Sequence, residues 1–265
     1  MWKSEKFSTA LTRYGLGMRQ LLPPGEDQNP LDVYDQPRPT PNNRPWVMVN
    51  MISSLDGAIS VAGTSGGLGN PADQKVLGTL RSLADIILVG AGTVRAEGYR
   101  PPRTPYPEAA QRRAARHQAP RARLAVVTGR GDLDPQGALF ADHPPEDPLP
   151  LIFTTSHGAA ALGESFIGRA EVVVLPGPLV DPSLVMEGLH QRGAGIVLSE
   201  GGPSLNHQLA AAGLVDELCL TVSPLLVGGE GPGLINGPVL ESLEEFELAG
   251  LTTEDGLLFC RYLSA

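Results

Sequence analysis

The stretch Glu200-Gly201-Gly202-Pro203-Ser204 lies between an apolar run at 196–198 and a periodic segment at 205–212. It predicts a strand that ends at two glycines, followed by a helix with proline and serine in its first turn. Glycine lets a ligand approach the backbone closely, and a helix start offers unpaired N–H donors and a partial positive charge. The stretch therefore predicts a phosphate site, although an ordinary strand-to-helix turn explains this segment alone equally well.

The flanking sequence alternates between strand and helix patterns. Apolar runs predict strands at 46–49, 86–89, 124–127, 151–153, 172–175, 195–198 and 217–222, and apolar periodicity predicts helices at 73–83, 184–191 and 204–212. Such alternation indicates an α/β fold with a mostly parallel central sheet and helices on both faces. A last strand at 257–262 is expected to pair antiparallel at an edge of the sheet. The basic run at 109–123 is expected to be a solvated helix or loop.

The first part of the chain has a different composition. Residues 20–45 are rich in proline, asparagine and aspartate and lack periodic apolar positions. We therefore expect a proline-rich N-terminal arm over residues 1–43 and one domain over residues 44–265.

Composition excludes several classes of function. The net charge of -9 argues against a nucleic-acid-binding protein. No apolar stretch approaches the roughly 18 residues that cross a membrane, and the start has no secretory signal, so we expect a cytoplasmic protein without membrane contact. The five histidines show no metal-ligand spacing, so no metal is expected. Cys219 and Cys260 lie far apart in predicted strands and are expected to be reduced core thiols.

Ligands of open α/β sheets bind beyond the carboxyl ends of the strands, so the residues after each predicted strand are the candidates for a site. Glycines, hydroxyls and an arginine there suit a phosphorylated cofactor. The cofactor-binding candidates are Gly90, Thr93, Thr128, Gly129, Arg130, Gly201, Gly202, Ser204 and Leu205. The polar candidates beside them are Asn50, Asp56, Asp73, Glu97 and Glu200.

Several of these candidates also have simpler explanations. Asp56 and Gly57 form a common turn dipeptide, and Asp73 would be favoured in a first helical turn by the helix dipole. Arg130 is either a solvated loop residue or the cation that selects a 2′-phosphate. The loop after residue 89 lacks the third glycine of a Rossmann motif. The Gly-Lys-Ser/Thr loop of nucleoside triphosphatases does not occur.

Four blocks in this order resemble one known family. They are Ser-Leu-Asp-Gly at 54–57, Ile-Leu-Val-Gly-Ala-Gly-Thr-Val-Arg-Ala-Glu at 87–97, Glu-Gly-Gly-Pro-Ser-Leu at 200–205, and the segments at 213–217 and 224–229. The chain is similar over residues 44–263 to the reductase domain of bacterial riboflavin biosynthesis, which has a dihydrofolate-reductase-like fold. The zinc-deaminase signatures of the bifunctional enzyme do not occur. We therefore expect a stand-alone reductase, and the resemblance implies a homodimer.

The resemblance implies an NADPH-dependent reduction of a ribosylamino-pyrimidine, 5-amino-6-(5-phosphoribosylamino)uracil, to its ribitylamino form. It places Gly201 and Gly202 on the cofactor's pyrophosphate, with Thr93 and the turn at 128–130 near the phosphates. Glu97 takes the acidic position near the reacting sugar, where it would act as general acid together with Asp56, a task that needs a carboxyl of raised pKa. Glu200 takes the position of a substrate-contacting glutamate.

Two positions leave the substrate open. Asn50 stands where the riboflavin enzymes commonly carry a lysine, so a charged contact becomes a neutral one. The segment Gly-Asn-Pro-Ala-Asp at 69–73 is similar to the dihydrofolate reductase stretch whose carboxylate holds the pterin ring, which would make Asp73 a substrate-binding residue. A reductase of a pterin or another heterocycle therefore stays an alternative, as does a nucleotide-binding module without turnover.

Overall fold

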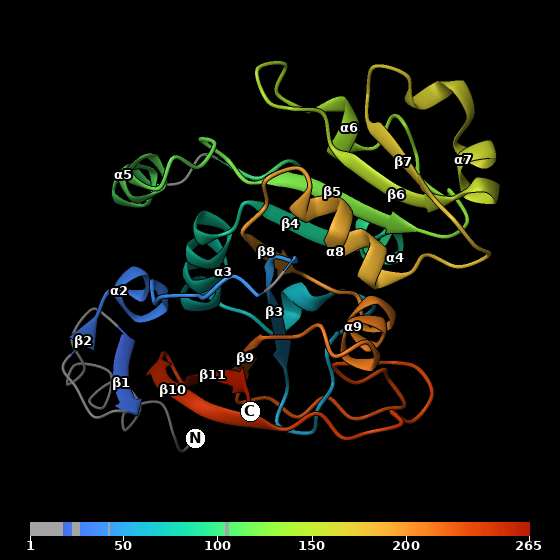
Figure 1. Cartoon of the computed structure of the whole chain (residues 1–265). Helices are drawn as coiled ribbons and strands as arrows, with labels where there is room; N and C mark the ends of the chain where they lie inside the picture. The colour runs from blue at the N-terminus through green and yellow to red at the C-terminus, as the bar shows by residue number, and fades with distance from the viewer. Residues whose placement is uncertain (1–17, 23–26, 42, 104–105) are drawn as a thin grey trace.

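A computed structural model describes residues 18–22, 27–41, 43–103 and 106–265 of the chain. In this described part, one eleven-stranded sheet has the order β2-β1-β10-β11-β9-β3-β8-β4-β5-β6-β7 (Figure 1). The strands are β1 (Met18–Leu22), β2 (Asp27–Gln28), β3 (Trp46–Ser53), β4 (Ile86–Gly90), β5 (Arg123–Thr128), β6 (Leu151–Thr155), β7 (Glu171–Leu175), β8 (Ile196–Ser199), β9 (Glu217–Val222), β10 (Phe246–Glu254) and β11 (Leu257–Ser264).

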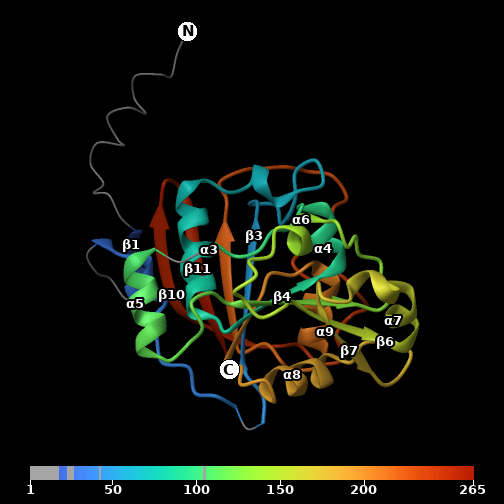
Figure 2. The ribbon, with the colours of Figure 1, turned by 90° about the horizontal axis from the view of Figure 1, so that it is seen from above.

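The helices connect the strands and cover the sheet. They are α2 (Pro30–Tyr34), α3 (Pro71–Leu83), α4 (Ala91–Ala96), α5 (Pro107–Ala115), α6 (Ala138–Ala141), α7 (Ser156–Leu162), α8 (Pro182–His190) and α9 (Pro203–Ala211), with 3₁₀ turns η1 (Ser65–Gly67) and η2 (Gly163–Phe166). Figure 2 shows α3, α4 and α6 on one side of β4, and α8 and α9 on the other. Helices on both faces of the sheet were predicted from the alternation of the sequence.

Strands β9, β3, β8, β4, β5, β6 and β7 are parallel, whereas β11, β10 and β1 extend the sheet with antiparallel pairs. The predicted fold class is therefore confirmed. One detail of the prediction is wrong, because β11 pairs with both β9 and β10 and so lies inside the sheet instead of at its edge. The partner strand β10 begins in an acidic stretch and is mostly half-exposed, so its sequence carries little strand signal.

Two apolar layers fix the helices on the sheet. On one face Val49 of β3 and Leu88 of β4 pack with residues of α8 and α9. On the other face Met48 of β3 packs with Leu80 of α3. Neighbouring residues of β3 thus point to opposite layers, as the alternation of a strand requires. This alternation also places Asn50, two residues after Met48, on the α3 face of the sheet.

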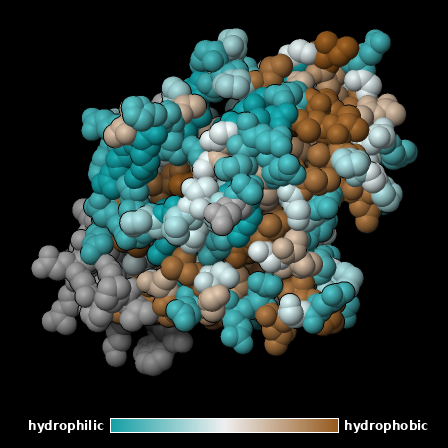
Figure 3. All heavy atoms as spheres, viewed as in Figure 1, coloured by the Kyte–Doolittle hydropathy of each residue, from teal (hydrophilic) through white to brown (hydrophobic). Residues whose placement is uncertain are grey.

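The N-terminal segment, expected to be an arm, contributes to this sheet where the structure describes it. Strand β1 pairs with β10, and Leu31 and Tyr34 of α2 are buried in the layer of α3. Residues 1–17, 23–26 and 42 of the expected arm lie outside the described part. Figure 3 shows an apolar surface area over β7 and α7, where Ile167 and Val174 are exposed. No helix among the described residues is both long and apolar enough to cross a membrane.

Candidate functional site

The loops after β4 and β8 are joined at one edge of the sheet. The Gly90 N–H donates to the Gly201 carbonyl oxygen at 2.7 Å, and the Glu200 N–H donates to the Leu88 carbonyl oxygen at 3.0 Å. Any Cβ atom at Gly90 would lie 3.5 Å from the backbone nitrogen of Gly202. The structure therefore brings Gly90, Gly201 and Gly202 together, as the two glycine-containing motifs predict.

The glycine pair has no room for side chains. Gly201 has a φ of 78°, and a Cβ there would lie 3.3 Å from the Met51 sulfur. A Cβ at Gly202 would lie 2.7 Å from the Thr93 hydroxyl oxygen, and the peptide bond between the two glycines is cis. Bare main chain thus faces Thr93, which is the close backbone approach for which glycine is suited.

Helix α9 begins directly after the glycine pair. Gly202 is its N-cap residue and provides no side-chain cap, and Pro203 occupies the first turn. Ser204 is exposed, whereas the side chain of Leu205 is buried, so Leu205 offers its backbone N–H alone to a ligand. The start of α9 therefore combines uncapped donors with the positive end of the helix dipole.

Asn206 is a buried polar residue of this corner that was not predicted from the sequence. Its carboxamide oxygen accepts from the Ser199 hydroxyl at 3.1 Å, and its carboxamide nitrogen donates to the Leu234 carbonyl oxygen at 3.3 Å. Ser199 in turn accepts from the Gly201 N–H at 3.3 Å. This buried network holds the glycine turn against the loop around residue 234.

Strand β5 is the neighbour of β4 in the sheet, and hydrogen bonds stabilise the turn that follows β5. The Thr128 hydroxyl accepts from the Gly131 N–H at 3.1 Å, and the Thr155 hydroxyl donates to the Gly129 carbonyl oxygen at 3.0 Å. Thr155 was missed by the sequence analysis. Arg130 is exposed at the tip of the turn and forms no ion pair with any residue that the structure describes. Its guanidinium is therefore available to an anionic ligand.

Glu200 is held by two residues that the sequence analysis did not select. Arg81 near the end of α3 donates from Nε to Oε1 and from a terminal nitrogen to Oε2, each at 2.7 Å. The Tyr99 hydroxyl also donates to Oε2, and the Arg81 guanidinium lies 5.5 Å from the centroid of its ring. Burial, and then the Glu200 carboxylate, raise the pKa of Tyr99. Glu200 therefore has a single orientation beside a phenol that keeps its proton.

The two acids expected to act in catalysis lie in different surroundings. Glu97 is exposed at the end of α4 and accepts from the Ser65 N–H at 2.8 Å. Asp56 accepts hydrogen bonds from the Ser54 hydroxyl and from the N–H groups of Val227 and Gly228, which together lower its pKa to about 2. The expectation of a raised pKa is thus wrong for Asp56, because the neighbouring Ser54 hydroxyl and the distant loop at 227–228 both donate to its carboxylate. Asp56 anchors that loop as a carboxylate.

Asn50 of β3 and Asp73 of α3 lie on the same face of the sheet, the face that α3 covers. Asn50 is in register with Cys219 of β9, and Ile52 is in register with Thr221. Asp73, in the first turn of α3, is only 9% exposed. Burial raises the pKa of Asp73, and a hydrogen bond with the Thr221 side chain opposes that shift. The structure therefore places a buried carboxyl near the ends of β3 and β9.

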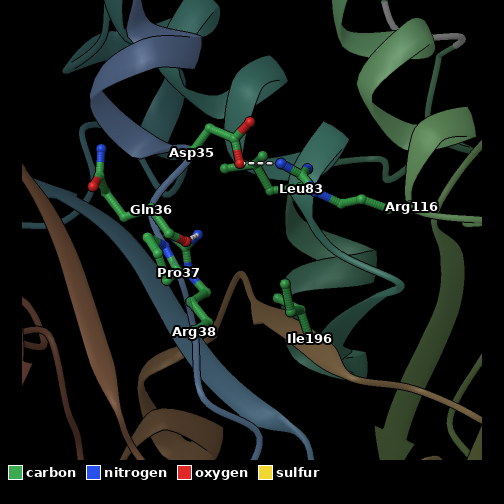
Figure 4. Close-up of a pocket in the computed structure, with 7 residues that line it drawn as sticks. All are labelled: Asp35, Gln36, Pro37, Arg38, Leu83, Arg116 and Ile196. Atoms are coloured by element: carbon green, nitrogen blue, oxygen red, sulfur yellow. Dashed lines mark hydrogen bonds and ion pairs between the residues drawn. The ribbon is translucent and has the colours of Figure 1, made fainter.

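A separate hollow lies at the opposite edge of the sheet. It has a volume of about 360 Å³ and is lined by Asp35, Gln36, Pro37, Arg38, Leu83, Arg116 and Ile196 (Figure 4). Ile196 begins β8, whereas Glu200 follows its end, so this hollow is separate from the predicted site. The charged groups that line it already have partners, since Arg116 forms an ion pair with Asp35 and Arg38 forms one with Glu217. None of the predicted site residues lines it.

Comparison with known proteins identifies the family. A model of the RibD C-terminal domain matches residues 45–256. The chain belongs to the RibD C-terminal domain family. The family model covers every element from β3 to the end of β10, and therefore all the predicted site residues. The resemblance inferred from the four sequence blocks is confirmed.

Relatives of the family agree with this assignment. The 2,5-diamino-6-ribosylamino-4(3H)-pyrimidinone 5′-phosphate reductase of Methanothermobacter thermautotrophicus is 28% identical over 203 residues, which are 76% of this chain and 88% of that protein. The riboflavin biosynthesis protein RibD of Mycobacterium tuberculosis is 28% identical over 186 residues, which are 70% of this chain and 44% of that protein. The crystal structure of a pyrimidine reductase-like protein from Corynebacterium diphtheriae superposes with a TM-score of 0.79 at 27% identity, covering 90% of this chain and 99% of that one.

Proposed function

We propose that this protein catalyses the NADPH-dependent reduction of a ribosylamino-pyrimidine 5′-phosphate to its ribitylamino form. The observation that carries the proposal is the contact between Gly90 and Gly201, which joins the two glycine motifs at one edge of the sheet in a chain of this family. Relatives named as reductases of such a pyrimidinone phosphate support the choice of substrate.

The residues at this edge fit a dinucleotide diphosphate. A Cβ at Gly202 would lie 2.7 Å from the Thr93 hydroxyl oxygen and one at Gly201 only 3.3 Å from the Met51 sulfur, so backbone alone lines this position. The uncapped start of α9 adds the N–H groups of Ser204 and Leu205, and Thr93 adds a hydroxyl. We assign the diphosphate to this cradle, and the 2′-phosphate to the exposed Arg130 on the turn of Thr128 and Gly129.

The remaining residues bind and orient the sugar. When bound, NADPH supplies the hydride that adds to the C1′ carbon of the opened ribosylamine, while a proton reaches its nitrogen. Glu97, exposed at the end of α4, is the carboxyl assigned to that proton. Arg81 and Tyr99 hold Glu200 in one orientation, in which it accepts from the sugar hydroxyls. Asp56 holds the loop at 227–228, because its low pKa does not suit a proton donor.

Steady-state turnover tests the proposal. We expect the purified protein to consume NADPH when the ribosylamino-pyrimidine 5′-phosphate is added. The loss of NADPH absorbance measures the rate, and the ribityl product is then identified. Glu97→Gln should lower kcat by about 100-fold or more while the Kd of NADPH is unchanged. Glu187→Gln on α8 is the matched control, because Glu187 is exposed on the other face of the sheet. Absence of turnover by the unmodified protein would contradict the proposal.

We also propose a cytoplasmic homodimer, with residues 1–43 as an N-terminal arm and residues 44–265 as the reductase domain. Large apolar side chains that are exposed in the loop between β9 and β10 support the dimer: Leu226, Val239 and Leu243. Such residues are favoured in protein interfaces over free surfaces. The mass in solution, measured by light scattering, decides between a dimer and a monomer.

A further inference from the structure

Helix α9 begins without a side-chain cap. Gly202 occupies its N-cap position and has no side chain that could accept from the first N–H groups. A serine, threonine or aspartate cap would fix the first turn, but it would also occupy an N–H group that the proposed cradle offers to the diphosphate. The N–H groups of Ser204 and Leu205 therefore stay free only if another part of the chain holds the first turn in place.

A segment far along the chain contacts this turn. Residues 234–238 lie in the loop between β9 and β10 and are here called the strap. The Asn236 N–H donates to the Pro203 carbonyl oxygen at 3.0 Å. The Leu234 carbonyl oxygen accepts from the Asn206 carboxamide nitrogen at 3.3 Å. The strap is thus attached to the first residue of α9 and to a buried side chain one turn later.

The ring of His207 forms a third contact with the strap. Its Nε2 donates to the Pro238 carbonyl oxygen at 2.6 Å, and Gly237 lies against the same ring. A Cβ at Gly237 would lie 2.5 Å from Cγ of His207, so a side chain there would push the strap away from α9. The three contacts use a carbonyl oxygen and two side chains of α9, and none uses its backbone N–H groups. The strap therefore holds the turn and leaves the donors available to a ligand.

We propose that the strap takes the place of the missing cap, with Asn206 and His207 as positioning residues that fix the N–H groups of α9 for the diphosphate of NADPH. This inference rests on the proposed function. Asn206 also links the strap to the glycine pair, because its carboxamide oxygen accepts from the Ser199 hydroxyl, which accepts from the Gly201 N–H. Donors that are already fixed bind a ligand more tightly than donors that binding must first order. Release of the strap should therefore weaken the binding of NADPH and leave the reaction of the bound complex unchanged.

Two variants release the strap from opposite sides. Gly237→Ala places a methyl group against the His207 ring, and His207→Ala removes the donor to Pro238. We expect each to raise the Kd of NADPH about tenfold, because the donors must then be ordered on binding. The KM of the ribosylamino-pyrimidine 5′-phosphate and kcat at saturating NADPH should stay within about twofold of their values in the unmodified protein, whereas a general loss of folded protein would lower kcat. His207→Gln keeps a donor and should restore much of the affinity.

Gly231→Ala is the matched control for these variants. Gly231 lies in the same loop, and a Cβ there meets no atom within 4 Å, so this variant should bind NADPH as the unmodified protein does. Hydrogen exchange over residues 234–238 reports on the strap itself, because the Asn236 N–H is protected while it donates to Pro203. We expect faster exchange there in the two release variants and unchanged exchange in the control.

The outcomes separate this inference from the proposed function. Kd values of NADPH within about twofold of the unmodified protein in both release variants would overturn the inference and leave the proposed function standing. Unchanged exchange at the strap in both variants would also overturn it, because the contacts with His207 would then not hold the segment. If the unmodified protein bound no NADPH, the proposed function would be wrong, and the inference would be wrong with it because no diphosphate would bind at α9.

Discussion

The two ends of β9 hold polar groups on the same face of the sheet, but the groups are paired to different degrees. At its start Glu217, with no exposed surface, accepts from Arg38, Arg261 and the Trp46 indole. At its end the Thr221 side chain hydrogen-bonds to the carboxyl of Asp73, which forms no ion pair with any residue that the structure describes. The first end therefore has its buried charge fully compensated within the chain. The second end holds a buried carboxyl without a charged partner among the described residues, so the two ends differ in how their buried acid is compensated.

The largest effect is expected on stability, when the carboxylate at the start of β9 is removed. Glu217→Ala leaves Arg38 and Arg261 buried without their carboxylate, and loss of one partner of such a group costs about 3–5 kcal/mol in the free energy of unfolding. Denaturant unfolding measures this cost. Glu171→Ala is the matched control, because Glu171 also binds two arginines but is exposed, and should cost no more than about 1 kcal/mol. If both variants lost the same free energy of unfolding, the buried Glu217 cluster would contribute no more to stability than the exposed ion pairs of Glu171.

The same cluster gives a pH dependence. Burial alone would raise the pKa of Glu217, but Arg38 and Arg261 hold it below its ordinary value. A carboxyl whose pKa is lower in the folded than in the unfolded protein stabilises the fold above its unfolded pKa, near 4, and this contribution is lost as the pH falls through the folded pKa. Acid unfolding of Glu217→Gln should therefore depend less steeply on pH than that of the unmodified protein.

The next effect concerns cofactor binding at the open end of the sheet. Gly201→Val adds a branched side chain at a φ of 78°, beside the Met51 sulfur, and should weaken NADPH binding about 100-fold or more because the main chain is no longer accessible. Fluorescence titration of NADPH gives the Kd. Gly193→Val carries the same backbone strain at a φ of 83° in open space, so it should leave the Kd unchanged. An unaltered Kd in Gly201→Val would contradict the cradle.

Local signals explain why the glycine corner was predictable. Residues 196–212 contain an apolar run, two glycines, proline and helical periodicity in one continuous segment, and they form β8 and α9 as predicted. Helix α3 likewise follows its periodicity, and it begins at Pro71, slightly before the predicted start, because the Asn70 side chain accepts from two N–H groups of the first turn. These features depend on neighbours in sequence.

The partners of the site acids were not predictable, because they are distant in sequence. Arg81 looks like an ordinary cation in the last turn of a helix, yet its contact with Glu200 spans 119 residues. The pKa of Asp56 is lowered first by the nearby Ser54 hydroxyl and then by the Gly228 N–H, whose hydrogen bond to Asp56 spans 172 residues. Arg113, in the basic run expected to be solvated, is 1% exposed because its guanidinium donates to the carbonyl oxygens of Ser82 and Ala84. In each case tertiary contact overrides a local pattern.

The smallest expected effect tests how open the cofactor end is. Arg130 is exposed and carries a charge that no described residue neutralises, and NADPH differs from NADH by a 2′-phosphate whose negative charge and oxygens suit a guanidinium. Arg130→Ala should weaken NADPH about tenfold and leave NADH nearly unaffected, since one partly exposed charged contact is worth about that much. Arg95→Ala on the neighbouring helix α4 is the control, because Arg95 already has Asp132 as its partner. If Arg130→Ala weakened the binding of NADPH and NADH equally, Arg130 would stabilise the turn and not bind the 2′-phosphate. Its charge would then have a structural role, as the charges of the Glu217 cluster have.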